Sequence, residues 1–187
     1  MRTWDEAYYA CRGWILGACF AFLAYARLLS DREVAPAGLA LVAAGLGYRL
    51  HAGRYIQAHS NHLRWSAGPL ATGGPYGLGR HPLYLANLLV ALGLVWFAHC
   101  LPAWAGSLLM AGIFFHHALL AGAEERFLEA RLGEPYARYR ESTSRWLGFP
   151  RPGPTGSEPE GLWIAWRRQG GNLAKTGAAV LLLWGLA

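Results

Sequence analysis

The sequence predicts an all-α fold, an integral membrane bundle of four to five transmembrane helices. Three observations support this. Hydrophobic residues make up 54% of the 187 residues and charged residues 15%, whereas a typical soluble domain carries about 25% charged residues. The apolar residues occur in continuous blocks, not in alternation. The arginines gather between these blocks, as they do in cytoplasmic loops. The net charge of +6 therefore suits anionic lipid better than nucleic acid.

The first two spans are predicted from apolar runs near the N-terminus. Residues 8–29 are long enough to cross a bilayer. Arg12 and Arg27 lie near the two ends of this run, where long side chains can snorkel to the headgroups. Residues 34–50 form a shorter run that is rich in Gly and Ala. Such small residues let neighbouring helices approach closely.

The third and fourth spans form a hairpin. The third begins at Pro82, because proline suits the first position of a helix, and continues to about residue 98. After the turn "HCLP", Pro102 opens a fourth span that is expected to end near Gly122. The charged segment 124–151 follows, and within it residues 127–132 are expected to form an amphipathic helix that ends at Gly133.

The C-terminal apolar stretch, residues 173–187, has 15 residues, which as a helix measure about 22 Å and are short for a full span. Either it extends backwards through residues 163–168, or the chain has been cut. The basic segments 51–81 and 123–151 are both expected on the cytoplasmic side, because the "HCLP" turn between them contains no Lys or Arg. The two segments should converge there.

Acidic residues and histidines are distributed unevenly. No Asp or Glu lies between Glu33 and Glu124, and all seven histidines fall in that interval. The pair Glu124–Glu125 either marks the end of a membrane helix or provides one carboxylate for a cationic ligand at low dielectric. Glu125 lies about 100° around the helix, so substitution there is expected to weaken binding of such a ligand much less than substitution of Glu124.

The segments "TGGPYGLGRHPLY" (72–84) and "EERFLEARLGEPYARYRESTSRWLGFP" (124–150), separated by the hairpin, resemble one family. These are the membrane methyltransferases, which comprise isoprenylcysteine carboxyl methyltransferases, their bacterial relatives and phospholipid N-methyltransferases. The resemblance covers about residues 50–150 of a single domain, 1–187, with residues 151–187 as a C-terminal extension. It implies S-adenosylmethionine as cofactor, bound in a pocket at the cytoplasmic face.

The resemblance also implies a set of donor-binding residues. The segment that lines the donor pocket in such enzymes matches His81, Pro82, Leu83 and Tyr84. The tyrosine of the preceding G-x-Y turn matches Tyr76, and a donor-contacting glutamate matches Glu124. Arg80 is expected at the rim as a cation for the donor carboxylate. Spacing alone adds Asn61, Gly68, Pro69, Leu70 and Ala71.

The sequence departs from the family at Leu120, where the eukaryotic isoprenylcysteine enzymes have an arginine thought to engage the substrate carboxylate. His117 lies two turns before Glu124 on the same helical face, and we predict it as the catalytic base for an amine. The alternative is a packed histidine bonded to a backbone carbonyl, and His116 competes for the role. N-methylation of a phospholipid amine is therefore favoured over carboxyl O-methylation of an isoprenylcysteine-like substrate.

Other functions stay open. Integral-membrane sterol reductases, which use NADPH, resemble the R-H-P-x-Y segment, and a non-catalytic helical membrane protein is a third possibility. His59 and His62 could share a metal, but no third ligand is nearby, so no metal site is predicted. Arg138, Arg140 and Arg145 are expected to form a lipid-facing basic surface or to contact a substrate phosphate. The expected partners are the bilayer and a lipid or other hydrophobic acceptor.

Overall fold

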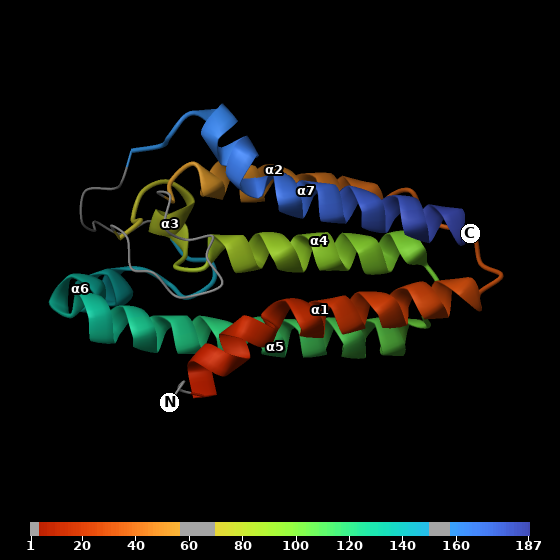
Figure 1. Ribbon diagram of the computed structural model, residues 1–187, viewed down its shortest axis with the longest axis horizontal. Helices are drawn as coiled ribbons and strands as arrows, with labels where there is room; N and C mark the ends of the chain where they lie inside the picture. Colours follow the sequence, from red (N-terminus) through yellow and green to blue (C-terminus); the bar gives the residue numbers. More distant parts are fainter. Residues whose placement is uncertain (1–3, 57–69, 150–157) are drawn as a thin grey trace.

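The computed structural model describes residues 4–56, 70–149 and 158–187, and every regular element within these ranges is a helix (Figure 1). The all-α part of the predicted fold class is therefore confirmed. The seven helices are α1 (Trp4–Leu28), α2 (Gly38–Gly53), α3 (Pro75–Leu78), α4 (Pro82–Ala98), α5 (Ala103–Leu132), α6 (Glu134–Ser142) and α7 (Leu162–Gly185).

The five long helices lie side by side (Figure 1). Helices α1, α4 and α7 run away from the end of the bundle that carries α3 and α6, and α2 and α5 run back towards it. We call this end the α3–α6 end. The two basic segments meet there: the Arg80 amide donates to the Ser144 carbonyl at 2.9 Å, and the Gly148 amide donates to the Leu78 carbonyl at 2.8 Å. The predicted convergence is thus present.

Several predicted boundaries agree with the structure, and two predicted elements are joined. Helix α4 begins at Pro82 and ends at Ala98 as expected, and α7 extends the C-terminal apolar stretch backwards to Leu162. The fourth span, expected to end near Gly122, and the amphipathic helix expected after it form one helix, because α5 continues without interruption to Leu132. The residues after Gly122 are mostly good helix formers. The helix ends only at Gly133, whose φ of 62° favours glycine.

Small residues hold α2 and α4 together. A Cβ atom added to Gly93 of α4 would lie 2.7 Å from the Val42 nitrogen and 2.8 Å from the Gly38 oxygen of α2. Gly45 is equally close to Ala86 and Val90 on α4. The glycines predicted to allow close helix packing therefore lie at a backbone-to-backbone interface.

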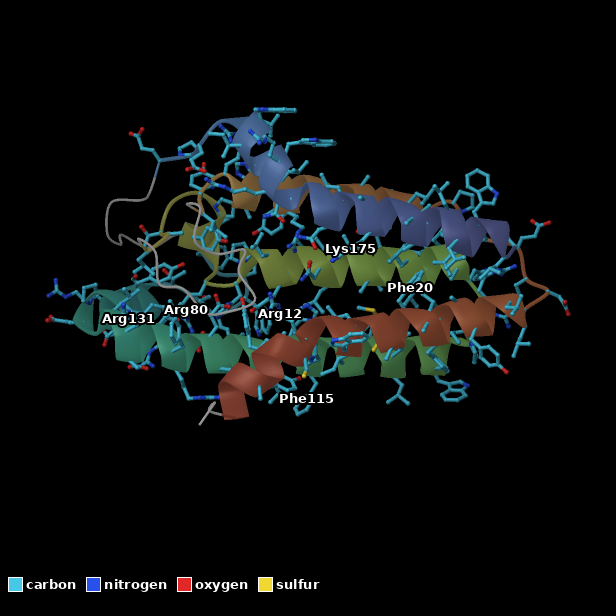
Figure 2. All side chains as sticks on the ribbon, in the orientation of Figure 1. Arg12, Phe20, Arg80, Phe115, Arg131 and Lys175 are labelled. Carbon is cyan, nitrogen blue, oxygen red and sulfur yellow. The ribbon has the colours of Figure 1, made fainter. Side chains whose placement is uncertain are left out.

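By length and composition, two described helices could cross a membrane: α5 and the Cys11–Leu28 part of α1. Helix α4 is apolar but shorter. Large apolar side chains point outward from these helices, including Phe115, which Figure 2 shows on the outer side of α5. Arg27 does not snorkel as expected. It is buried and donates to the Ala98 carbonyl at the C-terminus of α4, where the helix dipole favours a cation.

Candidate functional site

A cavity of about 950 Å³ lies between the helices, and all seven described helices contribute to its wall. It is open on one side, because exposed residues such as Trp14 and Lys175 are part of its lining. Polar side chains line the part near the α3–α6 end, among them Tyr84 and Glu124. Further along α1 and α4, the wall consists of apolar residues such as Phe20, Leu94 and Val95. The cavity is therefore amphipathic, with a polar compartment that continues into an apolar one.

The described residues that the sequence predicts as site residues all line this cavity: His117, Tyr76, Arg80, His81, Pro82, Leu83, Tyr84, Glu124, Leu70 and Ala71. Asn61, Gly68 and Pro69 lie outside the described residues, as do His59 and His62. The fold thus brings predicted site residues that are up to about 50 positions apart in the chain to the wall of one cavity.

Glu124 is the only acid among the described residues that line the cavity. Its side chain is 34% exposed, and its Oε2 accepts a hydrogen bond of 2.8 Å from the Tyr84 hydroxyl. The His81 ring stacks on the Tyr84 ring, with centroids 5.4 Å apart, and its Nδ1 lies 3.7 Å from Glu124. The carboxylate is therefore held in position but keeps an open side towards the cavity.

Glu125 has a different environment, because it is buried in an ion cluster. Its Oε1 lies 2.8 Å from Arg80 Nη2 and 3.2 Å from His81 Nε2, and its Oε2 lies 2.5 Å from Arg145 Nη2. Hydrogen bonding to Glu125 raises the pKa of Arg145. The expectation that Glu125 tolerates substitution better than Glu124 concerns donor binding and stays a prediction. For stability, Glu125 is the more sensitive position, since its removal would leave the buried Arg80 without its carboxylate partner.

Arg80 lines the cavity, but its guanidinium is already used. Besides Glu125, it donates to the backbone carbonyls of Arg140, at 3.0 Å, and Thr143. Arg80 consequently fixes the segment after α6 against the start of α4. Binding the carboxylate of a donor, as the sequence predicts, would require it to give up some of these partners.

Three buried tyrosines connect α3 and α6 at the cavity. The Tyr139 hydroxyl donates to the Tyr76 carbonyl at 2.7 Å. Burial, with the charge of Glu124 as a further cause, raises the pKa of Tyr76 well above its usual value, so its hydroxyl stays protonated. Tyr136 is also buried, and its hydroxyl has no hydrogen-bond partner among the described residues. Because a buried unpaired hydroxyl is costly, a ligand donor or acceptor at this end would fit it.

His117 belongs to a polar network at the centre of the bundle. Its Nδ1 lies 2.8 Å from the Ile113 carbonyl, so Nδ1 carries the proton and Nε2 keeps its lone pair. Asn87 Nδ2 lies 3.4 Å from that Nε2, and Arg49 donates to Asn87 Oδ1 at 2.5 Å. Arg49 also donates to Gln169 on α7 at 2.9 Å. The contact at Nδ1 agrees with a packed histidine bonded to a backbone carbonyl, and the lone pair at Nε2 is what a catalytic base requires.

His116 is a poorer candidate for the base. It does not line the cavity, and its Nδ1 lies 2.6 Å from the Tyr8 hydroxyl. Sequence reasoning missed Asn87, which contacts His117, and Arg49, which donates to Asn87. A polar residue inside an apolar run was the available signal for Asn87.

The basic residues divide into paired and unpaired groups. Arg138, Arg140 and Arg145 are paired with Glu134, Glu129 and Glu125, respectively. All three side chains are also partly exposed, and the predicted basic surface towards lipid or a substrate phosphate stays a prediction. Arg12, Arg49 and Lys175 line the cavity, and no described carboxylate lies within ion-pair distance of them.

No protein-family model and no solved structure matches this chain. The chain is similar to the cobalt-zinc-cadmium resistance protein CzcN of Cupriavidus metallidurans, with 36% identity over 114 residues. The match covers 61% of this chain and 46% of CzcN, so the chain spans less than half of that protein's length. None of these comparisons tests the resemblance to methyltransferases, which stays a prediction.

Proposed function

We propose that this protein is a multi-pass membrane enzyme that transfers a methyl group from S-adenosylmethionine to a lipid-like acceptor, with a phospholipid amine favoured. The observation that carries the proposal is the amphipathic cavity, in whose polar compartment Glu124 is the one acid among the described lining residues. A cationic donor and a lipidic acceptor need such a combination, because one requires a carboxylate and the other an apolar channel.

The membrane part of the proposal has its own support. Two helices are long and apolar enough to span. The outward side chains of α1, α5 and α7 include Trp14, Leu108, Phe115, Leu181 and Trp184, and each is more than half exposed. An apolar surface of this extent suits contact with lipid. We place the α3–α6 end, which collects the basic segments, on the cytoplasmic side.

The donor would occupy the polar compartment. Glu124 would face its positive charge, and the unpaired Tyr136 hydroxyl and the protonated Tyr76 hydroxyl would bind its polar groups. Arg49, whose partners Asn87 and Gln169 are neutral amides, could receive its carboxylate. When bound, S-adenosylmethionine supplies the methyl group, and the residues around it contribute chiefly by holding donor and acceptor in line.

His117 would act on the acceptor. An amine must lose a proton before its lone pair can attack, and a neutral imidazole with a free Nε2 can accept that proton. The long contact from Asn87 to Nε2 would be released when the amine enters. The hydrogen bond from Nδ1 to the Ile113 carbonyl holds the required tautomer.

Carboxyl O-methylation is the second candidate, and one observation favours it. Leu120 offers no cation, but Arg12, Arg49 and Lys175 reach the same cavity from other helices and could bind a substrate carboxylate. The name of CzcN concerns resistance to cobalt, zinc and cadmium. A cavity lined by unpaired cations does not favour a divalent metal as its ligand, so we do not extend that role to this chain.

The donor is tested by thermal unfolding in detergent with S-adenosylhomocysteine and, separately, with NADPH. A ligand that binds only the folded state raises the melting temperature, and we expect this from S-adenosylhomocysteine alone. Glu124→Gln should weaken binding of S-adenosylmethionine, which carries the sulfonium charge that S-adenosylhomocysteine lacks, by about 1.5 to 3 kcal/mol, the range for a charge-assisted hydrogen bond. Glu134→Gln, which changes an exposed carboxylate outside the cavity, is the matched control. Stabilisation by NADPH alone would support the reductase instead.

The acceptor is tested by supplying methyl-labelled donor with phosphatidylethanolamine or with a farnesylated cysteine analogue. Label in phosphatidylethanolamine, lost in His117→Ala but not in His116→Ala, supports amine methylation with His117 as the base. Label in the farnesyl compound alone would refute the preference for an amine.

A further inference from the structure

Lys175 is the only lysine in the 187 residues, and it lies in the middle of α7 and lines the cavity. Among the described residues it has no hydrogen-bond or ion-pair partner. Neighbouring residues of the same helix face, Gly171 and Asn172, line the cavity as well. Lys175 is exposed, so its ammonium lies at the open side of the cavity, with no described protein anion beside it.

Arg12 approaches the same space from α1. Its guanidinium carbon lies 3.8 Å from the centre of the Tyr9 ring, and Nη1 donates to the Tyr9 carbonyl at 2.8 Å. Neither contact neutralises the positive charge of Arg12, and no described carboxylate lies within ion-pair distance of it. In Figure 2, Lys175 lies on the α7 side of the α4 ribbon and Arg12 on its α1 side, with Arg80 nearer the α3–α6 end and Phe20 further from it.

The charge balance of the cavity is therefore positive. Arg80 and Arg168 are paired with Glu125 and Glu160, which leaves three cations, Arg12, Arg49 and Lys175, against Glu124. Arg12 and Arg49 are half-buried and Lys175 is exposed, so the cost of an unpaired charge at low dielectric falls mainly on the two arginines. A ligand anion would compensate them, and the apolar residues beyond Arg12, such as Leu16 and Phe20, would contact an attached alkyl chain.

We propose that Arg12 and Lys175 form an anion subsite that binds the phosphodiester or carboxylate of an amphiphilic acceptor, with its chain in the apolar compartment. That the bound amphiphile is a methyl acceptor rests on the proposed function. The subsite itself is inferred only from the charge and position of the two residues. It gives the acceptor's phosphate a cationic partner without a counter-charge, unlike Arg138, Arg140 and Arg145, which are already paired. An amine linked to that phosphate would point towards Glu124 and His117.

The single lysine provides a direct probe. Reductive methylation with ¹³C-formaldehyde labels Lys175 and the chain's N-terminal amine and keeps the positive charge. In a neutral maltoside detergent and without donor, we titrate a dialkyl phosphate, a fatty carboxylate, the corresponding neutral alkanol and inorganic phosphate. We expect a saturable shift of the Lys175 methyl signal with the two anionic amphiphiles, the N-terminal signal serving as reference. An equal response to the alkanol or an equal affinity for inorganic phosphate would overturn the subsite.

Variants then separate this inference from the proposed function. Arg12→Gln should weaken binding of the amphiphile about tenfold, which corresponds to about 1.4 kcal/mol. Arg167→Gln, an exposed arginine of α7 that does not line the cavity, should leave binding unchanged. An equal loss in both variants would overturn the subsite.

Stabilisation by S-adenosylhomocysteine should be the same in Lys175→Gln as in the parent protein. Its loss in that variant would assign the cation to the donor and refute the acceptor subsite. Its absence in the parent protein would instead defeat the proposed function while amphiphile binding still stood.

Discussion

Glu124 and Glu125 are neighbours in the chain, yet we expect opposite consequences when each is changed to glutamine. Glu125 is buried and holds Arg80, His81 and Arg145, so Glu125→Gln should destabilise the fold. Glu124 is one third exposed and has one hydrogen bond, from Tyr84, so Glu124→Gln should affect ligand binding far more than stability.

The size of the effect follows from the exposure of the partners. Removing one member of a buried ion pair costs about 3 to 5 kcal/mol. Arg80 is 9% exposed and belongs to this class, whereas Arg145 is 45% exposed, and an ion pair at the surface is worth only about 0 to 1 kcal/mol. Glutamine still accepts one hydrogen bond, so we expect about 2 to 4 kcal/mol for Glu125→Gln. For Glu124→Gln, the loss of a charged acceptor for Tyr84 predicts about 1 kcal/mol or less.

The assay is the midpoint of thermal unfolding of the ligand-free protein in detergent. A change of 1 kcal/mol shifts this midpoint by about 2 to 4 °C in a chain of this size, so Glu125→Gln should lower it by about 4 to 16 °C. Glu124→Gln should unfold within about 4 °C of the parent protein. Equal midpoints for the two variants, or a lower one for Glu124→Gln, would refute the assignment of the structural role to Glu125.

Three further predictions concern packing and polar contacts. Gly93→Ala would force α2 and α4 apart, because the added Cβ would lie 2.7 Å from the Val42 nitrogen, and overpacking of this kind costs about 1 to 3 kcal/mol. Gly112→Ala is the control, because an added Cβ there meets nothing within 4 Å. Equal midpoints of thermal unfolding for the two variants would contradict the close packing of α2 and α4. Tyr139→Phe should lose about 1 kcal/mol with the hydrogen bond to the Tyr76 carbonyl. Because burial raises the pKa of Tyr139, this difference between Tyr139→Phe and the parent protein should persist up to pH 10, and its disappearance between pH 8 and pH 10 would show that the hydroxyl ionises there. Asn87→Leu should reduce methyl transfer while leaving the stabilisation by S-adenosylhomocysteine in place, since Asn87 contacts His117; unchanged transfer would remove Asn87 from the site.

Features with local causes could be predicted from the sequence. The start of α4 at Pro82 and the end of α5 at Gly133 depend on the backbone preferences of proline and glycine. The meeting of the two basic segments follows from the hairpin of α4 and α5 between them. The same topology explains why residues matched to the family's donor site surround one cavity.

Features that depend on distant partners could not be predicted. Glu124 and Glu125 look alike in the sequence, and what separates them is Arg80, 45 positions earlier, and Arg145 in the loop after α6. Lys175 lies in an apolar run, and only the packing of α7 decides that it lines the cavity. The position of Arg27 near the end of an apolar run predicts snorkelling, and only the packing of the end of α4 against it gives its guanidinium a partner inside the protein.

The most direct test of the central claim is label transfer in proteoliposomes that contain phosphatidylethanolamine and a farnesylated cysteine analogue. The protein is supplied with methyl-labelled S-adenosylmethionine, and label is counted in the lipid extract, with Glu124→Gln as a variant and Glu134→Gln as its control. We predict label in the extract, chiefly in phosphatidylethanolamine, with a strong reduction in Glu124→Gln alone. The claim that this protein is a membrane methyltransferase would be contradicted by the following result: the protein is folded, no S-adenosyl compound stabilises it, and the lipid extract contains no label.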